Sequence, residues 1–162
     1  MEKRVSNEKK ERTVRLAESL IREIREFIAG AILNNQRIAD RLGINYTDQQ
    51  VLNLVDLLSD AKPGDLARLT GLTTGGITMS LDRLEKAGYV HRERNPRDRR
   101  SVIIRMAPER RRKILELHQT ASQVMAKIFA AYGEKELALI LDFFGRTNRA
   151  RVEHYKAMAR DD

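Results

Sequence analysis

The sequence contains no cysteine and no tryptophan, and only 3 of its 162 residues are proline. Without cysteine, the chain can form no disulfide, no thiolate nucleophile and no cysteine-ligated metal site. No run of about 18 apolar residues occurs, so no transmembrane helix is expected. The first residues continue into charged sequence rather than into the apolar segment of a signal peptide. These absences favour a soluble, cytoplasmic protein.

Positive charge is the main feature of the composition. Lys and Arg number 31 against 23 Asp and Glu, which leaves a formal net charge of +8, while 41% of the residues are hydrophobic. That apolar share is enough for a compact core, and the excess charge suits a polyanionic partner. The motifs of nucleotide-binding loops, zinc proteases and serine hydrolases do not occur, so neither an enzyme nor a cofactor is expected. The three histidines, which are far apart in sequence, do not indicate a metal site.

Helical periodicity dominates both ends of the chain. Residues 1–12 are highly charged and predict a disordered or basic N-terminal arm. Apolar residues then recur at helical spacing from Val14 to Leu42, with a potential kink at Gly30. A helix this long cannot bury its apolar stripe within one small domain and therefore needs a partner. At the other end, two more long helices are predicted on either side of a break at Gly133.

The middle of the chain predicts short helices separated by turns. Thr47 and Gln50 form a capping-box pattern that opens the first of them. Pro63 suits the first turn of the second helix, which is predicted to end at Gly71. The third helix ends at Gly88. Its inward face is predicted to consist of Ile77, Leu81 and Leu84.

Two strand patterns, at residues 89–94 and 101–106, flank a turn at 95–100. The alternation in the second strand predicts a buried face made of Val102, Ile104 and Met106. The turn carries Arg97, Arg99 and Arg100. Short helices joined by a tight turn and followed by a hairpin make a winged helix-turn-helix, a mainly α fold with a small β-hairpin wing (α+β).

The second helix of a helix-turn-helix fits the major groove of B-DNA. Small residues at its start let the backbone approach the duplex, and free N–H groups there can bind a phosphate. Arginines on a thin hairpin can enter a minor groove. The same threonines and glycines also suit a plain helix start, and a charged turn can be merely solvated. The outward residues of the helix are Thr73, Thr74, Gly75, Gly76, Thr78, Met79 and Arg83.

Three stretches together carry a family resemblance. The segment 71–78 (GLTTGGIT), then 82–90 (DRLEKAGYV) and 95–101 (NPRDRRS), resembles the MarR family of bacterial transcription regulators, most closely over residues 62–108. The resemblance implies a homodimer that binds a pseudo-palindromic operator in double-stranded DNA. Members usually repress genes and release DNA when a small aromatic or phenolic anion binds.

The resemblance also assigns a role to each part of the chain. It implies a helical dimerisation region at 13–45 and 108–162, and a winged helix-turn-helix DNA-binding lobe at 46–107. Contacts to DNA are carried over to the outward helix residues and to the wing. The wing contacts fall on Asp98 and Arg100, with Arg97 and Arg99 beside them. Asp98 is expected to orient an arginine, because a carboxylate holds a guanidinium fork well.

One position departs from the family pattern. Many members have arginine after the threonine that matches Thr78, whereas this chain has Met79. Methionine cannot make the bidentate contact of arginine to guanine, so specificity must come from thymine methyl groups, from Arg83 or from DNA shape. Met79 and Ser80 offer few hydrogen-bonding groups to bases. They therefore suggest an alternative, an architectural DNA-binding protein with little sequence preference and no effector. The absence of cysteine excludes the peroxide-sensing branch of the family.

The ligand site of the family lies between the dimerisation helices and the DNA-binding lobe. Aromatic and apolar residues on the helices that border this cleft are candidates to line it, and packing in a core or interface is the alternative for each. These residues are Phe27, Ile28, Tyr46, His118 and Tyr132. The sequence therefore predicts a dimeric repressor with an effector pocket.

Overall fold

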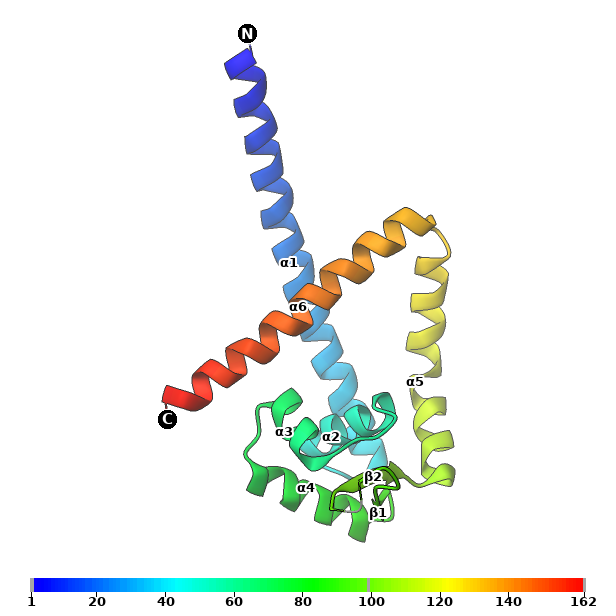
Figure 1. Cartoon of the computed structure of the whole chain (residues 1–162). Coiled ribbons are helices and arrows are strands. Elements are labelled where there is room, and N and C mark those ends of the chain that lie inside the picture. Colours follow the sequence, from blue (N-terminus) through cyan, green and yellow to red (C-terminus); the bar gives the residue numbers. More distant parts are fainter. Residues whose placement is uncertain (1, 99, 162) are drawn as a thin grey trace. The chain divides into compact units, whose positions relative to one another are not determined.

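The computed structural model of the protein describes residues 2–98 and 100–161, and the chain divides into two compact units after Tyr46. The described residues form six helices and one antiparallel hairpin, which confirms the predicted fold class (Figure 1). The elements are α1 (Glu2–Leu42), α2 (Tyr46–Leu57), α3 (Pro63–Thr70), α4 (Thr74–Lys86), β1 (Val90–Arg94), β2 (Val102–Met106), α5 (Pro108–Phe129) and α6 (Glu134–Asp161).

The first unit is essentially one helix, α1, which begins at Glu2 and runs through Gly30 without a break. Residues 2–12 are part of this helix, and their role as an N-terminal arm stays a prediction. Charged residues with good helix propensity dominate this stretch, and side chains four apart support each other. Asn7 Nδ2 donates to Glu11 Oε1 at 3.0 Å, and Arg15 lies 3.9 Å from the same carboxylate. A contact of this segment with DNA stays a prediction.

An exposed apolar stripe follows α1. Its large side chains are between 47% and 59% exposed, and several repeat every seven residues, the spacing of a helix–helix seam. They are Val14, Leu20, Ile21, Phe27, Ile28 and Ile32. Contiguous exposed apolar side chains of this kind mark an interaction surface.

The core of the second unit forms around α4. The three predicted inward residues, Ile77, Leu81 and Leu84, are buried, as the helical spacing indicates. The neighbouring elements cover them with further buried side chains, namely Val51, Leu52, Val55, Leu66, Ile103 and Ile104. Burial of this face sets which side of α4 points outward.

The hairpin pairs β1 with β2 in antiparallel register from Val90↔Met106 to Arg94↔Val102. Ile104 also bridges to Ala61, whose carbonyl oxygen accepts from the Ile104 N–H at 2.8 Å. The predicted alternation is wrong at Val102, which is exposed, whereas Ile103 and Ile104 are both buried. Val102 lies at the outer end of the hairpin, beyond the part of β2 that other elements cover.

Helix ends mostly follow the predicted turn residues. Gly71 and Gly88 have φ angles of +74° and +72°, the left-handed conformation that ends a helix. The Gly71 N–H donates to the Ala67 carbonyl at 2.9 Å. The capping box is wrong, because α2 begins at Tyr46 and places Thr47 inside the first turn. Asn45, a favoured N-cap residue type, precedes the helix instead.

Gly71→Ala is expected to destabilise the protein more than the matched variant Gly88→Ala. At both positions alanine must adopt a positive φ, which costs about 1–3 kcal/mol. A Cβ on Gly71 would also lie 3.3 Å from Cδ2 of Tyr155, whereas nothing lies within 4 Å of a Cβ on Gly88. Urea denaturation of both variants measures the difference. Equal losses would contradict the close approach of α6 to the end of α3.

Candidate nucleic-acid interface

The start of α4 presents an open, polar edge. Thr73 caps the helix, and its Oγ1 accepts from the Gly76 N–H at 3.1 Å. The Thr78 hydroxyl donates to the Thr74 carbonyl at 2.9 Å. A Cβ on Gly75 would meet no heavy atom within 4 Å, so the backbone is accessible from this side. The helix start can therefore approach a flat or grooved partner closely.

The predicted DNA-contacting residues of α4 lie opposite its buried face. Met79 is 62% exposed, although it is adjacent to the buried Ser80. Gly76 is half-buried, and the other predicted residues are exposed, namely Thr73, Thr74, Gly75, Thr78, Met79 and Arg83. The structure thus brings these residues together on one surface of the helix. Their contact with DNA stays a prediction.

Arg83 differs from the other outward residues because it is held by a buried acid. Its Nε donates to Asp48 Oδ2 at 2.8 Å and its Nη2 to Asp48 Oδ1 at 2.7 Å. The Ser80 hydroxyl donates to the same Oδ1 at 2.6 Å. Asp48 is 2% exposed, whereas the Arg83 side chain is 46% exposed. The hydrogen bonds to Asp48 raise the pKa of Arg83 above its ordinary value, against an opposing effect of burial.

Asp48 is not among the residues predicted from the sequence, although its position carries a signal. Asp48 precedes Val51, Leu52 and Val55 at spacings of three, four and seven residues, which puts it on the buried face of α2. A carboxylate on a buried face needs a cationic or hydrogen-bonding partner. Ser80 interrupts the apolar face of α4 in the same way. Asp48 and Ser80 each interrupt the apolar face of a helix. Such a pair of polar residues indicates that the two side chains contact each other in the core.

The root of the wing is tied to α4 by Arg92. Its Nη2 donates to Asp82 Oδ1 at 2.6 Å, its Nη1 donates to Glu85 Oε2, and its main-chain N–H donates to Glu85 Oε1 at 3.1 Å. Burial lowers the pKa of Arg92, but these bonds outweigh that effect and raise the pKa above its ordinary value. The hairpin and α4 are therefore joined at the base of the wing.

A second arginine fixes β2 to the loop before α3. Arg105 Nη2 donates to Asp60 Oδ1 at 2.8 Å, and its Nη1 donates to the Ser59 carbonyl. Its Nε also lies 3.5 Å from Glu93 Oε2 across the hairpin. Both strands of the wing therefore have ionic anchors in the body of the second unit.

The tip of the wing is held by its own polar groups. The Asn95 side chain accepts from the Arg97 N–H at 2.9 Å and donates to Ser101 Oγ at 3.0 Å. Asp98 Oδ1 accepts from the Arg100 N–H at 3.1 Å. Arg97 and Arg100 are exposed, and Arg99 lies outside the described residues. Asp98 thus supports the main chain of the turn, and its action on a guanidinium group stays a prediction.

Comparison with known proteins identifies the family to which this interface belongs. A family model described as MarR family matches residues 36–101. The uncharacterized HTH-type transcriptional regulator YcgE of Bacillus subtilis is 37% identical over 134 residues, which cover 81% of this chain and 85% of that protein. The chain belongs to the MarR family. It is a DNA-binding transcriptional regulator, as the resemblance implied.

Other MarR proteins are similar to this chain in part of the sequence or in fold. The multiple antibiotic resistance protein MarR of Salmonella typhimurium is 29% identical over 92 residues, which cover 57% of this chain and 62% of that protein. The structure of a MarR protein from Peptoclostridium difficile superposes with a TM-score of 0.61 at 12% identity, over 86% of this chain and 91% of that one. Regulators of the MarR family bind DNA and act as dimers.

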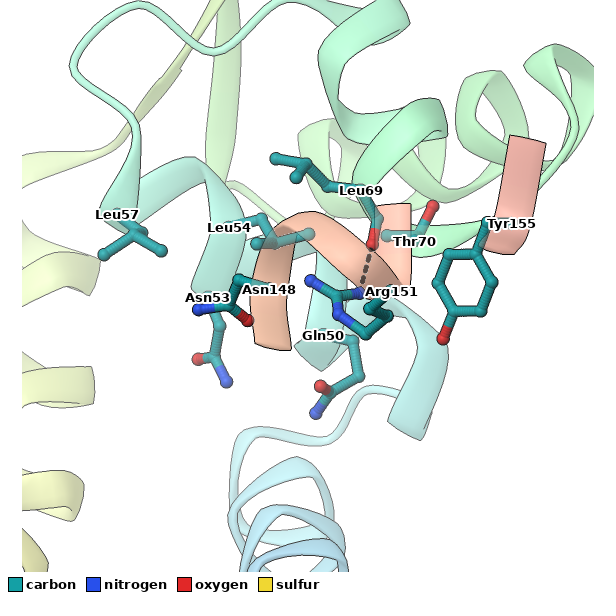
Figure 2. A pocket seen from close by; sticks show the side chains of 9 residues that line it. All are labelled: Gln50, Asn53, Leu54, Leu57, Leu69, Thr70, Asn148, Arg151 and Tyr155. Atoms are coloured by element: carbon teal, nitrogen blue, oxygen red, sulfur yellow. Dashed lines mark hydrogen bonds between the residues drawn. The ribbon is translucent and has the colours of Figure 1, made fainter. Parts of the chain in front are cut away.

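The second unit contains a pocket of about 470 Å³ between α2, α3 and α6 (Figure 2). Arg151 stands at its centre, where Nη1 donates to the Leu69 carbonyl at 2.8 Å and Cζ lies 5.5 Å from the centre of the Tyr155 ring. The rest of the wall is made by Gln50, Asn53, Leu54, Leu57, Thr70 and Asn148. The pocket therefore combines a cation, an aromatic ring and apolar walls.

The five residues predicted to line a MarR-type ligand site do not line this pocket. Phe27, Ile28 and Tyr132 are exposed, and Tyr46 and His118 are half-buried. A ligand-binding role for them stays a prediction. Within residues 2–98 and 100–161 there is no helix long and apolar enough for a membrane span, and no acidic or histidine cluster suited to a metal ion.

Proposed function

We propose that the protein is a homodimeric repressor that binds a pseudo-palindromic operator in double-stranded DNA and releases it when a small aromatic anion binds. The proposal rests first on the exposed edge of α4 beside an anchored, arginine-tipped wing. The lobe at 46–107 reads DNA, and the regions 13–45 and 108–162 form the dimer.

The surface of α4 supports recognition of base sequence. Thr74 and Thr78 offer hydroxyl and methyl groups, and Met79 offers an apolar contact to a thymine methyl. The bare backbone at Gly75 lets the helix enter the groove deeply. While α4 binds the major groove, the arginines of the wing bind a minor groove, where the negative potential is strong.

The apolar stripe of α1 supports a dimer of this chain. A second group of exposed apolar side chains occurs on α6, where four large residues are between 44% and 74% exposed, namely Leu139, Leu141, Phe143 and Phe144. Both surfaces lie in the regions proposed to form the dimer. A dimer would hold two α4 helices about 34–36 Å apart, one helical turn of DNA.

Selection of binding duplexes from a randomised pool, with the full chain as bait, tests the proposal. The expected result is an enriched palindrome with half-site centres about 10 base pairs apart. Fluorescence anisotropy at several salt concentrations should then give a log–log slope of about −0.9 for each neutralised phosphate. Equal affinity for all duplexes would instead support the architectural alternative. Deletion of the gene should raise transcription beside the selected sites if the protein represses.

The pocket supports an anionic effector, because Arg151 and Tyr155 offer charge and a ring face to an aromatic carboxylate. Benzoate and 4-hydroxybenzoate should raise the melting temperature of the protein and lower its affinity for the selected duplex. Benzyl alcohol, which lacks the charge, is the control. A melting temperature that none of these compounds changes would contradict this part of the proposal.

A further inference from the structure

Arg83 shows which of its hydrogen-bond donors remain available. The side chain has five N–H groups, and the two on the Nε–Nη2 edge point at the buried carboxylate of Asp48. Both hydrogens on Nη1 and one on Nη2 face away from that bond. The guanidinium group is thus fixed on one edge and free to bind an acceptor on the other.

The position of Arg83 along α4 separates it from the helix start. It follows Thr74 by nine residues, which corresponds to about 13 Å along the axis. In helix-turn-helix proteins the N-terminal residues of the recognition helix contact base edges. Arg83 instead lies in the last turns of α4, and its side chain is turned back toward α2 by Asp48. A side chain held in this way cannot extend its full length toward the floor of the groove.

We propose that Arg83 binds a phosphate of the DNA backbone rather than a base, and that Asp48 is the positioning residue that holds it for this contact. This inference rests on the proposed function and deepens it. Phosphates line both edges of the major groove, so they flank any helix that lies in it. Phosphate also suits the free edge of a guanidinium group, which binds it with two parallel hydrogen bonds.

The acid determines how Arg83 contributes to binding. A buried acid that takes three hydrogen bonds restricts the rotamers of the arginine before DNA arrives. Binding therefore loses less side-chain entropy than it would with a free arginine. The nearby carboxylate also weakens the long-range attraction of Arg83 for DNA, while the charge still acts on a phosphate in direct contact. Asp48 thus favours the matched complex over loose association.

Arg83→Gln tests the phosphate contact on the duplex selected by the wild-type protein and on its single-base variants. Affinity should fall roughly tenfold or more, because a charge-assisted hydrogen bond is lost. The fall should be equal across the base variants, and the log–log salt slope should lose about 0.9. A relaxed preference at one base pair, or an unchanged affinity, would overturn the inference. The first of these results would make Arg83 a base reader.

Asp48→Asn tests the positioning role, because the arginine keeps its charge and loses its acid. Affinity for the selected duplex should fall several-fold, while affinity for a scrambled duplex and the salt slope should not fall. A purely structural role would lower both affinities in parallel with thermal stability. The matched control is Asp65→Asn, which frees Arg68 from an exposed pair of 3.2 Å and should change neither affinity. Unchanged binding in Asp48→Asn would overturn the role of Asp48.

A second variant decides the matter if Asp48→Asn does not fold. Arg83→Lys keeps the charge but cannot form the fork, so it should lose most of the affinity that Arg83→Gln loses. Wild-type affinity in Arg83→Lys would overturn the positioning role. Failure of the proposed function is a separate result, in which the wild-type protein enriches no duplex. In that case the salt slope of Arg83→Gln on an unselected duplex still decides whether Arg83 contacts a phosphate.

Discussion

Leu81→Ala is expected to lower the free energy of unfolding by about 2–5 kcal/mol, the range for a leucine removed from a packed core. Leu81 is 1% exposed and lies between Ile77 and Leu84 on the inward face of α4. Single domains are stable by only about 5–15 kcal/mol, so the loss takes a large share of the total. The recognition helix would lose its fixed position, and DNA affinity should fall with it.

The control for this variant is Met79→Ala on the opposite face of the same helix. Its side chain is exposed, so the free energy of unfolding should change by no more than about 0.5 kcal/mol. Urea denaturation compares the two variants, and anisotropy on the selected duplex measures DNA binding in parallel. If Met79→Ala destabilised the protein as much as Leu81→Ala, the assignment of buried and outward faces would be wrong.

Arg100→Ala is expected to weaken binding to the selected duplex by about 1–3 kcal/mol. The side chain is exposed at the tip of a wing that Arg92 and Asn95 hold in place, so its loss removes a contact from an ordered support. The described bond of Arg100 to Asp98 uses the main-chain N–H, which alanine retains. Folding stability should therefore stay close to that of the wild-type protein.

Anisotropy at fixed salt measures this loss, and Arg146→Ala controls for the loss of one positive charge. Arg146 pairs with Asp142 at 2.8 Å on the exposed face of α6, outside the proposed DNA surface. Its replacement should change DNA affinity much less than that of Arg100. Similar losses in both variants would mean that the wing contributes only through net charge.

Local patterns predicted the parts of the fold that depend on neighbours in sequence. The inward residues of α4 follow from a spacing of four and three residues, and Gly71 and Gly88 end helices because the left-handed conformation favours glycine. The outward surface of α4 then follows without further information. Much of the candidate site was therefore accessible from the sequence.

The contacts that organise this surface come from residues far apart in the chain. Asp48 and Arg83 are separated by 35 positions, and Asp60 and Arg105 by 45. Spacing within one element cannot show which acid meets which arginine, because that depends on how the elements pack. The exposure of Val102 and the start of α1 at Glu2 have the same origin, since burial and helix length depend on surroundings as well as local pattern.

The bond inside the first turns of α4 limits what Thr78 can offer. Its hydroxyl hydrogen is already shared with the carbonyl of Thr74. Lone pairs and a methyl group remain for an outside partner. Such a side chain can accept a hydrogen bond from the amino group of adenine or cytosine and can contact the methyl group of thymine. While the hydroxyl donates to the Thr74 carbonyl, it cannot donate a hydrogen bond to the keto oxygen of guanine. Thr78 is therefore a hydrogen-bond acceptor, and not a donor, before any duplex binds.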